Sequence, residues 1–148
     1  MQGILAVTMG LVIAAHWKLT KAADNVPLAF DGQHELLFIG CRKPGMLIAL
    51  DAESGKEVTS VASAGQADDL FYDSALHRLY LISGAGEVDS YLLDDAKILH
   101  PIGVLHTAAG AKTALFVPAQ GMLYVGIPGA GDHAAEIRVY ATASSNAR

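Results

Sequence analysis

Three stretches of this chain repeat one pattern of short apolar runs separated by turns. The clearest is ADDLFYDSALHRLYLISGAGEVDSYLLDD, at residues 67–95, where Leu70–Asp73, Arg78–Ser83 and Glu87–Leu93 are typical of strands. The glycines at 84 and 86 suit the tight turn between the last two runs, because glycine accepts positive φ. Related stretches precede it (VPLAFDGQHELLFIGCRKPGMLIALD) and follow it (KTALFVPAQGMLYVGIPGAGDHAAEIRVY). A repeat that contains strands alone leaves few architectures open.

Aromatic residues keep the same register in all three repeats. Phe30, Tyr72 and Phe116 end the first strand, and Phe38, Tyr80 and Tyr124 follow eight residues later in the second. The spacing between equivalent residues is 42 and then 44, which is the length of one four-stranded β-propeller blade. The sequence therefore predicts an all-β propeller, with an evenly spaced β-sandwich as the alternative. Asp31 matches Asp73 in this register, whereas Val117 departs from it.

The expected organisation is a hairpin at 1–24, blades at 25–66 and 67–110, an incomplete blade at 111–142 and a tail at 143–148. The strands predicted for the first blade are Pro27–Phe30, Leu36–Cys41, Met46–Asp51 and Glu57–Ala62. The second blade adds His100–Leu105 as its fourth strand, and the last blade has Ala114–Val117, Leu123–Gly126 and Glu136–Tyr140. Helical periodicity is absent after the N-terminus.

The apolar N-terminus, MQGILAVTMGLVIAA, has two interpretations. It resembles the hydrophobic core of a signal peptide, but no Lys or Arg precedes it and the cleavage site is poor. It is too short for a transmembrane helix. We favour a hairpin of strands Ile4–Val7 and Val12–Leu19, as the third and fourth strands of a preceding blade.

Composition excludes several classes of function. The net charge of −5 and the lack of a basic cluster argue against nucleic acid as a partner. The single cysteine, Cys41, excludes an intramolecular disulfide and a cysteine-rich zinc site. A hydrophobic share of 52% supports a sizeable core.

About three blades cannot close a ring, so apolar blade faces would meet water at both ends. We expect two copies related by a twofold axis to form a homodimer of about six blades. The N-terminal hairpin of one copy would supply the outer strand that the last blade of the other lacks.

The repeats resemble the YVTN-type (YncE-like) β-propeller family. The stretches that carry the resemblance are HWKLTKAADNVPLAFDGQHELLFIGCRKPGMLIALDAESGKEV, ADDLFYDSALHRLYLISGAGEVDSY, LFVPAQGMLYVGIPGAG and AEIRVY. The resemblance implies the C-terminal half of a ring of six or seven blades, in a family whose members are often exported. It implies no single activity, because some relatives are lactonase-like, some resemble quinoprotein dehydrogenases by fold and many have no assigned function.

Propeller ligands usually meet loops at one mouth of the central channel. The candidate ligand-binding residues there are Asn25, Arg42, Lys43, Asp68, Asp69 and Lys112. Asp68 and Asp69 could hold Ca²⁺ as a cofactor through their carboxylate oxygens, or could pair with Arg42 or Lys43 of the preceding blade. We favour the salt bridge. Asp69 is also placed to accept backbone N–H groups from a neighbouring blade.

Catalytic and metal-binding patterns are lacking. Cys41 beside two cations could be a nucleophile, but no histidine can be placed next to it, so we favour a structural strand-end cysteine. The six histidines form no H-x-H or HExxH motif, and His34 and His77 fall in turns that should be exposed. We therefore predict no catalytic residue and no metal site.

The sequence favours a non-catalytic propeller that binds a small molecule or protein, or serves as a scaffold, and works as a homo-oligomer. One alternative is a lactonase-like hydrolase with its site at the channel mouth. Another is a truncated propeller fragment without a function of its own. The sequence predicts no single cellular compartment, because the resemblance suggests export whereas the N-terminus is a poor signal peptide.

Overall fold

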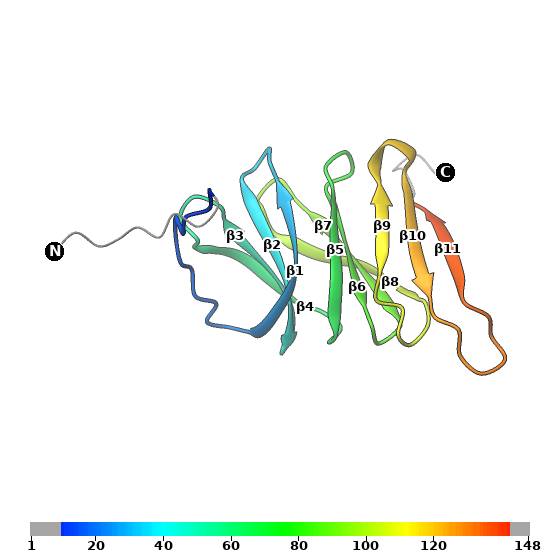
Figure 1. The fold of residues 1–148 in the computed structure, drawn as a ribbon. Coiled ribbons are helices and arrows are strands. Elements are labelled where there is room, and N and C mark those ends of the chain that lie inside the picture. The colour runs from blue at the N-terminus through cyan, green and yellow to red at the C-terminus, as the bar shows by residue number, and fades with distance from the viewer. Residues whose placement is uncertain (1–9, 143–148) are drawn as a thin grey trace.

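The computed structural model describes residues 10–142, which form three antiparallel sheets (Figure 1). The first sheet has β1 (Ala23–Asp31), β2 (Leu36–Lys43), β3 (Gly45–Asp51) and β4 (Glu57–Ala62), in that order. The second has β5 (Ala67–Asp73), β6 (Arg78–Ser83), β7 (Glu87–Leu93) and β8 (Leu99–His106). The third has β9 (Ala114–Val117), β10 (Met122–Ile127) and β11 (Glu136–Ala141), with the 3-10 turn Pro118–Gln120 between β9 and β10.

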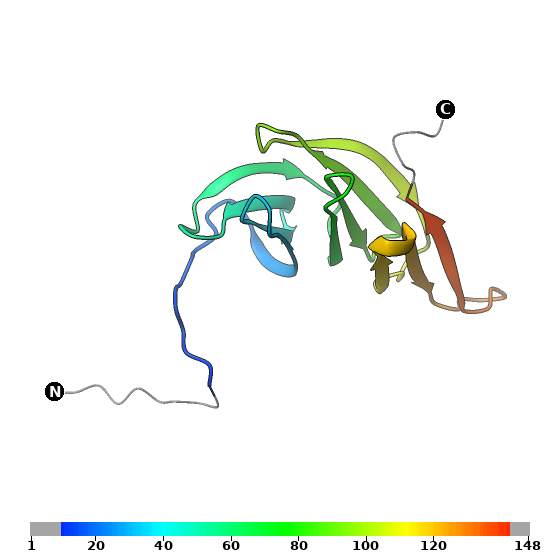
Figure 2. The same ribbon diagram turned by 90° about the horizontal axis from the view of Figure 1, so that it is seen from above.

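The sheets stand side by side in an open arc when viewed from above (Figure 2). The first strands β1, β5 and β9 lie on the concave side, and β4, β8 and β11 lie on the convex side. This is the arrangement of blades in part of a propeller, and it confirms the predicted fold class: two four-stranded blades and one of three strands.

Each blade boundary encloses an apolar cluster. Leu36, Phe38 and Leu47 of the first blade pack against Leu79, Leu81 and Tyr91 of the second. Ile82 and Val88 of the second blade pack against Phe116, Leu123 and Val125 of the third. The repeated aromatics meet at these boundaries, with ring centroids 5.2 Å apart for Phe38–Tyr72 and 5.5 Å apart for Tyr80–Phe116. Side chains that alternate along β6 and β7 therefore bury both faces of these inner strands, whereas β8 is exposed after Leu99.

The repeated aspartates close the first turn of their blades. The Oδ1 atom of Asp31 accepts the backbone N–H groups of Gln33 and His34, at 2.9 and 3.3 Å. Asp73 accepts those of Ala75 and Leu76 in the same way. Where Val117 replaces the aspartate, the chain forms the 3-10 turn that ends at Gly121 with φ of 60°.

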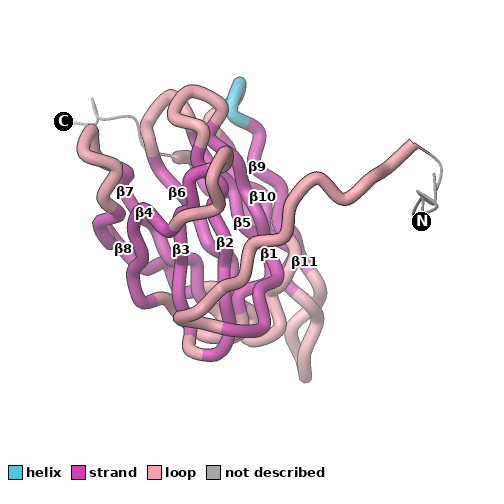
Figure 3. The backbone as a smooth tube through the Cα atoms, turned by 90° about the vertical axis from the view of Figure 1, so that its left-hand side faces the viewer, coloured by secondary structure: helices cyan, strands magenta, loops and turns pink. Residues whose placement is uncertain are grey.

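Residues 12–19, predicted as a strand of a neighbouring blade, form no strand in the single chain. A strand needs a neighbouring edge, and the N-terminal segment instead passes over part of the first sheet and extends beyond it (Figure 3). Its Leu19 packs against that face, and Trp17 lies so close to Gly55 that a Cβ there would be 2.2 Å from Trp17 Cγ. We call residues 10–22 the N-terminal arm.

The predicted strand Ile4–Val7 and the tail at 143–148 lie outside the described residues. Several observed strands are longer than predicted, most clearly β1, which begins at Ala23 rather than at Pro27. Within residues 10–142, no helix has the length and apolar character needed to cross a membrane.

Gly45 allows the loop between the first two blades to approach β3 closely. A Cβ at this position would lie 2.5 Å from the carbonyl oxygen of Ser63. We expect Gly45→Ala to lower the free energy of unfolding by about 1–3 kcal/mol, because backbone atoms must shift. Urea denaturation measures the change.

Gly103→Ala is the matched control, because Gly103 lies in β8 and a Cβ there would have no neighbour within 4 Å. We expect a change within about 1 kcal/mol of zero for this variant. Equal stability of the two variants would contradict the close approach at Gly45.

Candidate functional sites

The predicted channel mouth brings Arg42 and Asp68 together across the first blade boundary. Arg42 lies at the end of β2 and Asp68 near the start of β5, at the lower end of the arc in Figure 1. The Arg42 guanidinium donates to Asp68 Oδ1 at 2.5 Å and to the Ala67 carbonyl at 2.9 Å. Asp68 Oδ2 accepts the Gly84 N–H at 3.0 Å. The favoured salt bridge is therefore confirmed.

Asp69 joins the second blade to the third. Its carboxylate accepts the Leu70 N–H at 3.1 Å and the Ala114 N–H of β9 at 3.3 Å, which confirms the predicted backbone contact. Burial raises the pKa of Asp69, although these hydrogen bonds oppose the rise. Both aspartates at this mouth are thus engaged by the protein itself. In the part of the chain that the structure describes, no three His, Cys, Asp or Glu residues are grouped to hold a metal ion.

The other predicted mouth residues are exposed. Lys43 forms a solvent-exposed ion pair with Asp24 at 3.1 Å, and Asn25 lies opposite Cys41 in the β1–β2 ladder. The side chain of Lys112 lies against Gly84, and Lys112 also lines a shallow cavity of about 530 Å³ beside the third blade. Three of the six candidates are therefore available to a partner, whereas Arg42, Asp68 and Asp69 fasten blades together.

Cys41 is a core residue. Its side chain has no exposed surface and packs with Ile39 and Ile48 on the outer face of the first blade. Burial raises the pKa of the Cys41 thiol, so the reactive thiolate is disfavoured. Cys41 is therefore a buried core residue of β2, as the structural interpretation expects.

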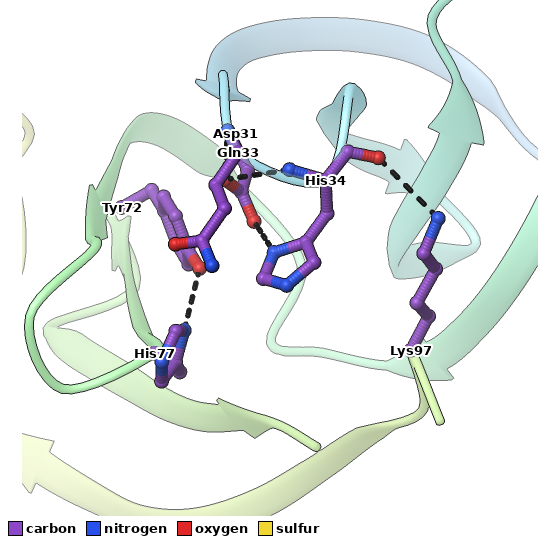
Figure 4. Close-up of polar contacts among 6 residues, drawn as sticks. All are labelled: Asp31, Gln33, His34, Tyr72, His77 and Lys97. Carbon is purple, nitrogen blue, oxygen red and sulfur yellow. Dashed lines mark hydrogen bonds and ion pairs between the residues drawn. The ribbon is translucent and has the colours of Figure 1, made fainter. Parts of the chain in front are cut away.

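The opposite mouth holds a polar cluster that the sequence did not predict (Figure 4). His34 Nδ1 lies 2.6 Å from Oδ2 of the buried Asp31, and the Tyr72 hydroxyl lies 3.2 Å from His77 Nδ1. The two imidazole rings are 5.9 Å apart. Lys97 adds a hydrogen bond of 3.4 Å to the His34 carbonyl. His34 and His77 are partly buried, whereas their place in turns suggested that they are exposed.

Hydrogen bonds keep the Asp31 carboxylate ionised. Burial would raise its pKa, but hydrogen bonds from His34, Tyr72 and two backbone N–H groups outweigh burial and hold the pKa below its ordinary value. Burial and the nearby Asp31 raise the pKa of Tyr72, so Tyr72 remains a neutral donor. The cluster links the first two blades through one buried anion. The signal in the sequence was the repeated aspartate with a histidine three or four residues after it.

We expect Asp31→Asn to lower the free energy of unfolding at pH 7 by about 1–3 kcal/mol, because a buried charged acceptor is lost. The folded pKa lies below the ordinary value of 3.8, so this contribution is complete above that value. It should disappear as the pH falls through the folded pKa. Urea denaturation of both proteins from pH 7 to pH 2 measures the difference. The exposed carboxylate Asp95, changed to Asn, is the control, and a constant Asp31 effect down to pH 2 would contradict the prediction.

Neither a scan against known protein families nor a search of curated protein sequences finds a match. Solved structures do match. A putative 6-phosphogluconolactonase from Bacteroides fragilis has a TM-score of 0.64 and 19% identity, over 74% of this chain and 33% of that one. BamB from Moraxella catarrhalis has a TM-score of 0.58 and 19% identity, over 80% and 34%. Sqt1 from Saccharomyces cerevisiae has a TM-score of 0.60 and 12% identity, over 82% and 37%.

These structures are β-propeller-like, and sequence identities below 20% support a similarity of fold alone. The chain spans about a third of the length of each neighbour. The described residues therefore have the fold of a propeller segment, built from two complete blades and a third of three strands.

Proposed function

We propose that this chain is a non-catalytic scaffold propeller that binds protein partners and works as a homo-oligomer, in which two copies close a ring of about six blades. The observation that carries the proposal is an aromatic contact that recurs at each blade boundary and is incomplete at both ends of the arc. Placement in the YVTN-type (YncE-like) family belongs to the same proposal, with the register of the aromatics as its support.

The boundary contact follows a simple rule. The aromatic of the second strand in one blade meets the aromatic that ends the first strand of the next, as in Phe38–Tyr72 and Tyr80–Phe116. Phe30 is the corresponding aromatic of β1, but no blade precedes the first blade, and 57% of the Phe30 surface is exposed. Tyr124 holds the second-strand place in a blade with no successor. Tyr124 of one copy and Phe30 of another would form the same contact.

The surfaces around these aromatics are also apolar. On the open face of the third blade, Leu115, Ile137 and Val139 are 59%, 66% and 54% exposed. Their strand partners place them around Tyr124: Leu115 and Val139 lie directly opposite it. On the open face of the first blade, Leu28 is 58% exposed beside Phe30. Exposed apolar faces of this kind favour association, and a twofold axis would pair each face twice.

The exposed side chains of Asn25, Lys43 and Lys112 at the channel mouth are the proposed contact points for a partner. A role in protein assembly is supported by a propeller-like neighbour within a structure described as the mitotic checkpoint complex, at 14% identity and a TM-score of 0.62. A lactonase-like hydrolase is the second candidate, since two structural neighbours are described as putative 6-phosphogluconolactonases. It has less support, because the mouth carboxylates it would use are already bonded within the protein.

We expect the purified chain to form a dimer with twice the 15.5 kDa chain mass, and Phe30→Asp to convert it to monomer. A carboxylate at the seam would be buried without a partner on association, whereas it meets water in the single chain. Light scattering after size-exclusion chromatography measures the mass. A monomeric natural chain would contradict the proposal, and an aggregate would favour the truncated fragment.

Ile98→Asp is the matched control, because Ile98 is also exposed (42%) but precedes β8, away from both open faces. This variant should remain dimeric. If it dissociates as fully as Phe30→Asp, added charge rather than the seam explains the loss.

A further inference from the structure

We infer that residues 12–19 of the N-terminal arm pair with the free edge of β11 in a second copy and become the fourth strand of its third blade. The inference deepens the proposed homo-oligomer and rests on it. It identifies which segment of the partner copy completes the unfinished blade.

The third blade has a vacant strand position. Among the described residues, β11 pairs with β10 alone. The Thr142 N–H bonds to Gly121 on the β10 side, so the alternation of an antiparallel ladder points the N–H groups of Ile137, Val139 and Ala141 away from β10. Such an unpaired edge is a template for another strand.

A groove lies between the edge of β11 and β8 of the second blade. A fourth strand of the third blade would cover this groove. Its volume is about 190 Å³, and Ile102 and Leu105 of β8 line one side while Tyr140 and Ala141 of β11 line the other. Ile102 is 47% exposed and Leu105 is 37% exposed. At the first blade boundary β4 occupies the corresponding position and contacts β8. Arg78, Ser90 and Thr142 also line the groove, so its lining is mixed in polarity, and the groove is open because the third blade lacks its outer strand.

The arm has the position in the repeat of a fourth strand. β4 begins at Glu57 and β8 begins at Leu99, 42 residues later. The equivalent position 42 residues before Glu57 is Ala15, which lies within the arm. The connection to the next blade also fits, since four residues separate β4 from β5 and three separate Leu19 from β1. In a closed ring, the blade before the first blade is the third blade of the other copy.

The side chains of the arm alternate as an outer strand requires. Ile13, Ala15, Trp17 and Leu19 share one side, and Val12, Ala14, His16 and Lys18 share the other. The first set can cover the apolar part of the groove, at Ile102 and Leu105, while the second, which holds both polar residues, meets solvent.

The single chain holds the arm loosely. Ile13 is 77% exposed and Val12 is 64% exposed. The arm is anchored near its end, by Trp17 against Gly55 and by Lys21, which bonds to Glu57 at 2.5 Å and to Ser60 at 3.2 Å. Leu19 packs on the open face of the first blade and Trp17 lies against Gly55, so docking of the third blade of another copy on that face would require this end of the arm to shift. Release of the arm and closure of the ring are therefore linked.

The test compares Val139→Pro with Val139→Ala. Both remove the valine side chain from the open face, but only proline also removes the outward N–H group that the arm would bind. We expect the dimer dissociation constant of Val139→Pro to exceed that of Val139→Ala by about tenfold. Sedimentation velocity over a dilution series measures both constants, and unfolding curves of the diluted monomers check that both variants fold.

Amide hydrogen exchange gives a second, direct result on the natural chain. The N–H groups of Ile137, Val139 and Ala141 should exchange rapidly in dilute monomer and slowly in the dimer. Equal dissociation constants for the two variants, with no added protection of these amides in a stable dimer, would overturn strand exchange while leaving the proposed homo-oligomer standing. A natural chain that stays monomeric at every concentration would overturn both.

Discussion

Every sheet in this molecule is apolar on both faces, and the structure depends on covering them. The inner strands of the middle sheet achieve this, because Leu79 and Tyr91 face the first blade while Ile82 and Val88 face the third, whereas β8 is exposed after Leu99. The two outer sheets are covered on one face by a neighbouring blade. The arm shields part of the first blade, at Ile39 and Ile48, but leaves Leu28 and Phe30 exposed. A linear stack of such blades ends in apolar surface, whereas a ring does not.

Polar side chains join neighbouring blades at both mouths. Arg42 and Asp69 each reach from one blade to the backbone of the next at one mouth. Asp89 of the second blade also accepts the N–H of Ala64, in the loop that joins the first two blades, at 2.7 Å. At the other mouth the cluster around Asp31 links the first two blades. Hydrogen bonds to buried charges lose much of their strength when misaligned, so these contacts fix how one blade sits on another.

The fold could be predicted from the sequence because its cause is local and repeated. Period-2 alternation gives the strands, and the fixed spacing of Phe38, Tyr80 and Tyr124 gives the blades. The Arg42–Asp68 ion pair could also be predicted, since a propeller brings the end of β2 next to the start of β5. The contact between the His34 and His77 rings could not be predicted, because it depends on how two turns from adjacent blades are oriented.

The arm shows the limit of pattern analysis most clearly. Its alternation and its place in the repeat both indicate a strand, yet residues 12–19 form none in the single chain. Alternating apolar and polar side chains indicate that a segment suits a strand with one buried face. They do not indicate which chain provides the neighbouring strand edge. An edge exists on β11, at the far end of the arc from the arm (Figure 1). The same residues can therefore lie loosely on their own first blade and still satisfy the repeat, provided that the edge belongs to another copy.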